Sequence, residues 1–236
     1  MERVNNLLLV IVAAALIGGC IQKDPPYGRE ATIRLPGQVG QVWAVAPALN
    51  LSGEQAVDPL LHADLVYQQL QQVRGLTVIP VNRVVEVYAG LGIDKVQSEQ
   101  QAAVVCDVLG ADGLLVPTVT IYDPFNPPKL GAALQLFRPS GSIVRQTGIS
   151  PSELARQAAP AEGQPQPVDV SFVQAVGMYD AANGSVRDAL KAYAAGRHEP
   201  KGPLGVKEYF VSMDRYCGFV YHELIRDLLK KQADSK

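Results

Sequence analysis

The chain has 236 residues, of which 47% are hydrophobic and 19% charged, and its formal net charge is −2. This hydrophobic content is enough to bury a sizeable core, while the charged fraction is below the roughly 25% of a typical soluble domain. The near-neutral charge excludes the broad basic surface with which proteins usually bind nucleic acid. We therefore expect no nucleic-acid partner.

Residues 1–19 have the pattern of a signal peptide. Arg3 precedes an apolar run over residues 7–19, which is shorter than the roughly 20 residues that a membrane-spanning helix needs. The run ends in Ile17, two glycines and Cys20, an order that resembles the bacterial lipobox. The resemblance implies cleavage between Gly19 and Cys20, and a mature N-terminus that carries acyl chains such as palmitate. An ordinary signal peptide that happens to end at a cysteine is the alternative.

Several acyl chains anchor a protein stably, whereas a single chain binds only marginally. We therefore expect a lipoprotein of the bacterial cell envelope that is held in a membrane through Cys20 and faces the periplasm. Ile21, rather than Asp, follows the cysteine, which favours the outer membrane. Residues 20–38 contain Pro25, Pro26 and a Pro36-Gly37 break, and we expect them to form a lipidated tether.

Residues 39–147 alternate between strand and helix patterns, which predicts an α/β (α+β) domain with a mixed sheet flanked by helices. Asp58 and Pro59 resemble the start of a helix that ends at Gly75. Pro117 predicts a bulge or an edge position for its strand. The expected strands are 42–49, 76–81, 112–122 and 132–137, and the other expected helices are 84–89 and 98–109.

Residues 148–168 are polar and rich in proline, which predicts a flexible loop. Residues 169–236 are expected to complete the domain as a C-terminal helical segment packed on it. Within this segment, residues 170–179 fit a strand or a helix, and Ser185 with Asp188 resembles a capping box. Residues 207–231 have the longest helical pattern of the chain.

The first half of the mature chain, residues 39–138, resembles a group of periplasmic α/β domains. The group comprises the N-terminal domain of TolB, the curli-secretion lipoprotein CsgG and the lipoprotein activators of penicillin-binding proteins. The matching residues are Pro47 with the turn Asn50-Leu51-Ser52-Gly53, the pair Asn82-Arg83, and Leu109-Gly110-Ala111-Asp112 at a helix end. The resemblance implies protein binding or assembly rather than catalysis. A curli-type pore is not expected, because residues 148–168 are too polar and proline-rich for transmembrane strands.

The sequence contains no recognisable catalytic constellation, so we expect no enzyme activity, cofactor or metal. His62, His198 and His222 lack the spacing of a zinc motif, and His222 lies beside an apolar helical stripe that favours a structural role. Cys106 and Cys217 lie in apolar, helix-like patterns. Two separate buried thiols are therefore favoured over a disulfide.

One loop is a candidate binding site. Tyr122 and Phe125 flank a rigid, proline-rich segment over residues 123–128 that could present aromatic side chains to a partner. A simple turn between two strands is the alternative. The leading hypothesis is a membrane-anchored, non-catalytic module that binds an envelope protein or assembles with itself. The alternatives are an envelope enzyme or small-molecule binder with a cleft between the α/β domain and the C-terminal helices, and a homo-oligomeric secretion component.

Overall fold

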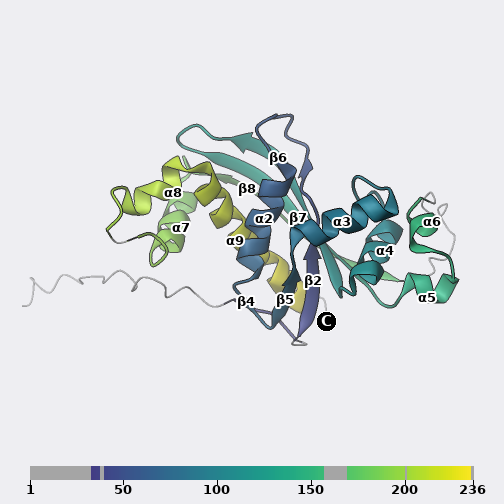
Figure 1. Cartoon of the computed structure of the whole chain (residues 1–236). Coiled ribbons are helices and arrows are strands. Elements are labelled where there is room, and N and C mark those ends of the chain that lie inside the picture. The colour runs from purple at the N-terminus through teal and green to yellow at the C-terminus, as the bar shows by residue number, and fades with distance from the viewer. Residues whose placement is uncertain (1–32, 38–39, 157–168, 200, 235–236) are drawn as a thin grey trace, which may run out of the picture.

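The computed structural model describes residues 33–37, 40–156, 169–199 and 201–234. The predicted signal peptide, Cys20 and most of the tether lie outside these residues. A central sheet lies between two layers of helices (Figure 1). The mixed α/β fold with a C-terminal helix packed on the sheet is therefore confirmed.

The central sheet is six-stranded, and five of its strands follow the order β5-β2-β6-β7-β8. The pairs β2–β5 and β2–β6 are parallel, whereas β6–β7 and β7–β8 are antiparallel. The five strands are β2 (Gln41–Val45), β5 (Leu76–Ile79), β6 (Gly113–Asp123), β7 (Lys129–Pro139) and β8 (Val170–Asp180). A short strand, β3 (Leu49–Asn50), also pairs with β6, and β1 (Ile33–Arg34) pairs with β4 (Val73–Arg74) in a separate two-stranded sheet.

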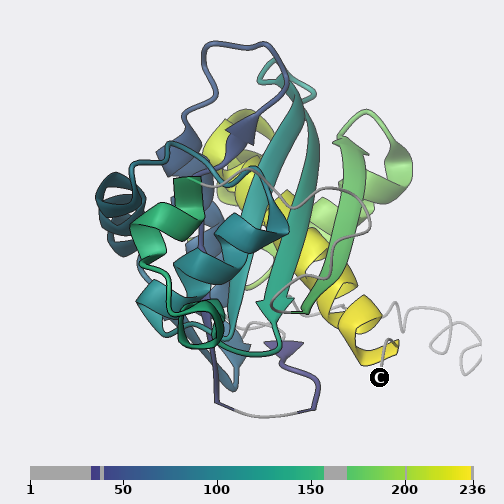
Figure 2. The ribbon, with the colours of Figure 1, turned by 90° about the vertical axis from the view of Figure 1, so that its right-hand side faces the viewer.

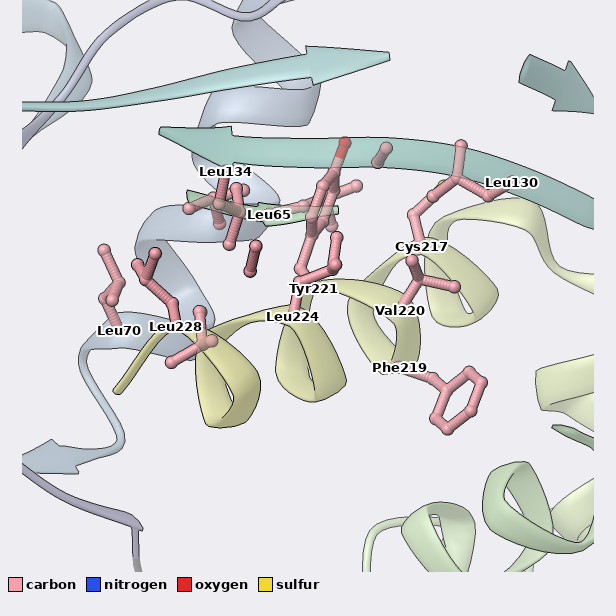
Figure 3. Close-up of a cluster of buried hydrophobic side chains, with 14 of the residues drawn as sticks. Leu65, Leu70, Leu130, Leu134, Cys217, Phe219, Val220, Tyr221, Leu224 and Leu228 are labelled. Atoms are coloured by element: carbon pink, nitrogen blue, oxygen red, sulfur yellow. The ribbon is translucent and has the colours of Figure 1, made fainter. Parts of the chain in front are cut away.

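Helices from both halves of the chain cover one face of the sheet. They are α2 (Pro59–Leu70), α7 (Gly184–Ala194), α8 (Glu208–Val211) after a 3₁₀ turn (Gly205–Lys207), and α9 (Met213–Asp234). Helix α2 begins as the sequence predicts, because the Asp58 carboxylate accepts hydrogen bonds from the N–H groups of Leu60 and Leu61. Helix α9 lies along β7 and β8, and its Tyr221 and Leu224 belong to the apolar core beneath the sheet (Figure 3).

The opposite face is covered over only part of its width. Helices α3 (Val81–Leu91), α4 (Glu99–Leu109), α5 (Ile143–Thr147) and α6 (Pro151–Arg156) pack there. Seen from this side, the helices lie in front of β2 and β6, while β8 lies uncovered at the right (Figure 2). The sheet therefore has one fully covered face and one face that is open near β8.

Pro117 lies in the middle of a central strand rather than at a sheet edge. On one side it is in register with Leu134 of β7. On the other side, β2 ends opposite Leu115 and β3 begins opposite Thr118. Proline has no backbone N–H to donate, so this gap between two short partners accommodates it. The register shift of β6 falls further along, between Val119 and Ile121.

Residues 170–180 form the strand β8, which decides between the strand and the helix that the sequence left open. The C-terminal half differs from the expectation in three places. Residues 151–156 form a helix within the segment expected to be a loop. The long helical pattern breaks at Ser212, whose backbone is extended. Asn183, rather than Ser185, caps helix α7, since its side chain accepts the hydrogen bond from the Ser185 N–H. Among the described helices, none is long and apolar enough to cross a membrane.

Candidate partner-binding surface

Strand β8 combines an open edge with exposed apolar side chains. In the described part of the chain it pairs only with β7. Val176 and Met178 are 61% and 64% exposed, and Phe172 is 45% exposed. These residues alternate along the strand and therefore share one face, whereas Ala175 is buried on the other face against the core beneath α9. A long, apolar edge strand readily pairs with another chain.

The exposed side chains of β8 continue into the neighbouring strands. In the ladder register, Val176 is opposite Ala133, and Met178 is opposite Gly131. Gly131 is in turn opposite Ile121, which is 38% exposed. A Cβ atom at Gly131 would lie 2.8 Å from Thr120 Oγ1 and 3.0 Å from Ile121 Cβ, so the bulge of β6 leaves room only for glycine. The exposed side chains of Val176, Met178 and Ile121 therefore form an apolar strip beside the helices that cover the rest of this face.

The predicted binding loop joins β6 to β7 at the same end of the sheet. Phe125 is 80% exposed, and its backbone N–H donates a hydrogen bond to Asp123 Oδ1 at 3.1 Å. Tyr122 instead packs edge-on against His62, with ring centroids 5.7 Å apart, toward the α2 side. The two aromatic residues therefore do not share one surface. Their role as partner contacts stays a prediction.

Buried polar groups occur between the sheet and its helices. His62 Nδ1 lies 2.6 Å from the Tyr221 hydroxyl, and both side chains are buried. Cys106 and Cys217 are two free, buried thiols, as expected. Burial raises the pKa of Cys106 to about 12, and it raises the pKa of Cys217 as well, with Asp214 adding to that effect. Neither thiol is ionised at neutral pH, so neither is an activated nucleophile.

His222 packs against the Tyr193 ring, with centroids 5.0 Å apart, and is 5% exposed. Burial, followed by the charges of Arg197 and Arg226, lowers the pKa of His222 to about 4 from its ordinary value of 6.5. The side chain is therefore neutral in the folded protein at physiological pH. This agrees with the structural role that its sequence position favours.

We expect the stability of the protein to fall as the pH decreases from about 6.5 to about 4. In this window the unfolded chain protonates His222 and the folded chain does not, so proton binding favours unfolding. The loss attributable to this group is at most about 3 kcal/mol. Urea unfolding at several pH values would measure it, with His222→Gln as the comparison. Below pH 6.5 the free energy of unfolding should fall more steeply with decreasing pH in the wild type than in His222→Gln. Parallel curves would contradict the lowered pKa of His222.

Two further cavities have polar linings, and neither lining includes Phe172, Val176 or Met178. One, of about 470 Å³, lies between α2 and the C-terminal helices. The alternative hypothesis of an enzyme or small-molecule binder expects a cleft in this position. Its polar groups bond to one another: the Tyr193 hydroxyl donates to Gln69 Oε1 at 3.1 Å. The other, of about 630 Å³, is lined by Asp107, which accepts from Ser142 Oγ and the Val144 N–H and so fixes the start of α5. No group of His, Cys, Asp or Glu able to hold a metal occurs in the described ranges.

Neither a protein family nor a curated protein matches this sequence. Among solved structures, the C-terminal domain of LpoB from Salmonella enterica is 15% identical, with a TM-score of 0.36, over 44% of this chain and 75% of that one. A lipoprotein from Neisseria meningitidis is 15% identical, with a TM-score of 0.36, over 64% and 94%. A hypothetical protein from Chlamydia trachomatis is 12% identical, with a TM-score of 0.38, over 82% and 95%. At these scores no function transfers to this chain.

Proposed function

We propose that this chain is a non-catalytic protein-binding module of the bacterial cell envelope, anchored through acyl chains on Cys20. The observation that carries the proposal is the uncovered strand β8, whose exposed residues Phe172, Val176 and Met178 are apolar on the open face of the sheet. Soluble proteins usually protect such edges with charge, proline or a covering element. An edge left open and apolar is typical of an interaction site.

The binding mode that fits this edge is strand addition. An extended segment of an envelope protein would pair with the β8 backbone, and its apolar side chains would pack on Val176, Met178 and Ile121. Backbone hydrogen bonds would supply affinity, and the side-chain pockets would supply specificity. The tether would keep the module near its membrane, which raises the effective concentration of an envelope partner.

Cross-linking in intact cells, followed by mass spectrometry of the adducts, tests this proposal. The double variant Val176→Lys/Met178→Lys places two charges on the strip without altering a buried residue. We expect it to lose the dominant adduct with an envelope protein, at least about tenfold, because each buried lysine would have to leave water. The matched control Leu204→Lys/Val211→Lys changes two apolar residues that are 49% and 56% exposed elsewhere, and it should keep the adduct.

Two outcomes would contradict the proposal. If the adduct persists unchanged in the Val176→Lys/Met178→Lys variant, the partner does not use β8. If wild-type protein forms adducts only with itself, and these disappear in the same variant, β8 is an interface between copies of this chain. That second result would support the homo-oligomeric alternative instead.

A further inference from the structure

A basic cleft of about 550 Å³ lies at the far end of the molecule from the turn between β6 and β7. It is formed by the segment around β1 and by the second half of α9. Its lining includes Arg34 from β1, and His222, Arg226 and Lys230 from α9. No carboxylate side chain is among the described residues that line it. The cleft therefore gathers positive charge on a protein whose net charge is −2.

The spacing of residues along α9 places two of the cations, Arg226 and Lys230, beside the neutral His222. His222, Arg226 and Lys230 are four residues apart and lie on one face of the helix. Two carboxylates of α9 are paired with its cations: Glu223 accepts from Arg226 Nη1 at 3.0 Å, and Asp227 pairs with Lys231 at 2.7 Å. Only Nη1 of Arg226 bonds to Glu223, so its other guanidinium N–H groups remain available.

Strand β4 adds one more cation, Arg74, beside Arg34 at this end of the molecule. Arg34 of β1 is in register with Arg74 of β4, and both side chains are exposed. No carboxylate in the described part of the chain pairs with Arg34 or Lys230. Guanidinium groups bind phosphate oxygens in a bidentate way, and an ammonium group adds a point charge. The cations that line the cleft, Arg34, Arg226 and Lys230, therefore suit a phosphate group rather than a cation or a neutral ligand.

The wall of the cleft contains a polar group without a partner. His222 is 5% exposed, and its Nδ1 atom has no hydrogen-bond partner among the described residues. An unpaired buried polar group calls for an explanation such as an ordered water. His222 is neutral, so it lines the cleft without adding a charge of its own.

The course of the chain places the cleft near a membrane. Strand β1 begins at Ile33, thirteen residues after Cys20. A fully extended segment of this length spans at most about 45 Å. If Cys20 carries the anchor, as the proposed function holds, the cleft lies within reach of the lipid surface. Docking the cleft there would point the β6–β7 turn away from the membrane (Figure 1).

We propose that the cleft of Arg34, His222, Arg226 and Lys230 binds the phosphate of an anionic lipid headgroup. Such a contact would orient the anchored domain and hold β8 clear of the bilayer. This inference rests on the proposed membrane anchor for the source of the phosphate, but not on the proposed protein partner.

Vesicle binding by the mature chain tests the site. All proteins would begin at residue 20 and carry Cys20→Ala, so that neither an acyl chain nor the apolar run over residues 7–19 contributes, and they would be mixed with vesicles of phosphatidylcholine alone or with added phosphatidylglycerol. We expect phosphatidylglycerol to increase binding by the protein with the intact cleft. Arg34→Gln/Lys230→Gln should reduce that increase about 25-fold, since each cation near an anionic surface contributes about fivefold. High salt should weaken the binding further.

The matched control is Arg83→Gln/Lys95→Gln, which removes the same charge from the α3 side of the sheet and should change binding by less than about twofold. Equal losses in both variants, or no effect of phosphatidylglycerol, would overturn the proposal. A parallel arm measures the melting temperature in inorganic phosphate and in chloride at equal ionic strength. If phosphate stabilises the protein with the intact cleft while phosphatidylglycerol has no effect, the site takes free phosphate and the lipid assignment is wrong. No partner protein is present, so these results are independent of the β8 test.

Discussion

Replacing Phe219 by alanine is expected to destabilise the protein by about 3–5 kcal/mol, which is a large part of the 5–15 kcal/mol that stabilises a typical domain. Phe219 is fully buried in α9, where its ring lies 5.9 Å from that of Tyr179, 5.6 Å from Tyr193 and 6.0 Å from Tyr216. These neighbours belong to β8, α7 and α9. The cavity would therefore loosen the contact between the sheet edge and the C-terminal helices (Figure 3).

Urea unfolding of the purified chain, followed by circular dichroism, measures this change. The control is Phe125→Ala, which removes the same side chain from a loop position that is 80% exposed. It should alter stability by less than about 0.5 kcal/mol. Similar effects of the two substitutions would contradict the packing described for α9. Because Phe125→Ala leaves the fold intact, it also shows in the cross-linking assay whether the β6–β7 turn contributes to partner binding.

The parts of the fold that follow from local chemistry could be predicted from the sequence. Asp58 and Ser98 cap α2 and α4 through their side chains, and Gly110 ends α4 with a left-handed backbone. Each of these signals depends on a few neighbouring residues. The order of the longer strands and helices from β2 to β7 follows from them, and the mixed α/β class is confirmed. The expected end of the first helix at Gly75 is wrong, because α2 ends at Leu70 and residues 73–74 form β4.

Features that depend on distant segments could not be predicted in this way. Strand β8 is apolar on both faces, with Ala175 buried and Val176 exposed, so its sequence shows no alternation that separates a strand from a helix. Pro117 is compatible with a central strand only because two separate short strands pair beside it. Neither the gap nor the partners can be read from the residues around the proline.

The candidate sites were only partly accessible to sequence reasoning. Tyr122 and Phe125 are three positions apart, yet the strand and loop geometry directs them to different surroundings. The cleft around His222 combines residues of β1 and α9 from opposite ends of the chain. Sequence periodicity identifies the apolar stripe beside His222, but it cannot show that Arg34 lies across from it.

Replacing Cys20 by alanine is expected to release the protein from the membrane fraction almost completely. The thiol is the attachment point for the diacylglyceryl group that the lipobox pattern implies, so the variant can carry no acyl chain. Fractionation of cells into membrane and soluble fractions, with immunoblotting of both, measures the release.

The control for this experiment is Cys217→Ala, which removes a buried thiol that carries no expected lipid. It should stay in the membrane fraction, and metabolic labelling with palmitate should mark it and the wild type but not Cys20→Ala. Sedimentation of Cys20→Ala with the membranes would refute the lipid anchor, unless washing at high salt releases the protein. Release by salt would mean that the basic cleft alone holds the domain at the surface, because electrostatic contacts are screened and acyl chains are not.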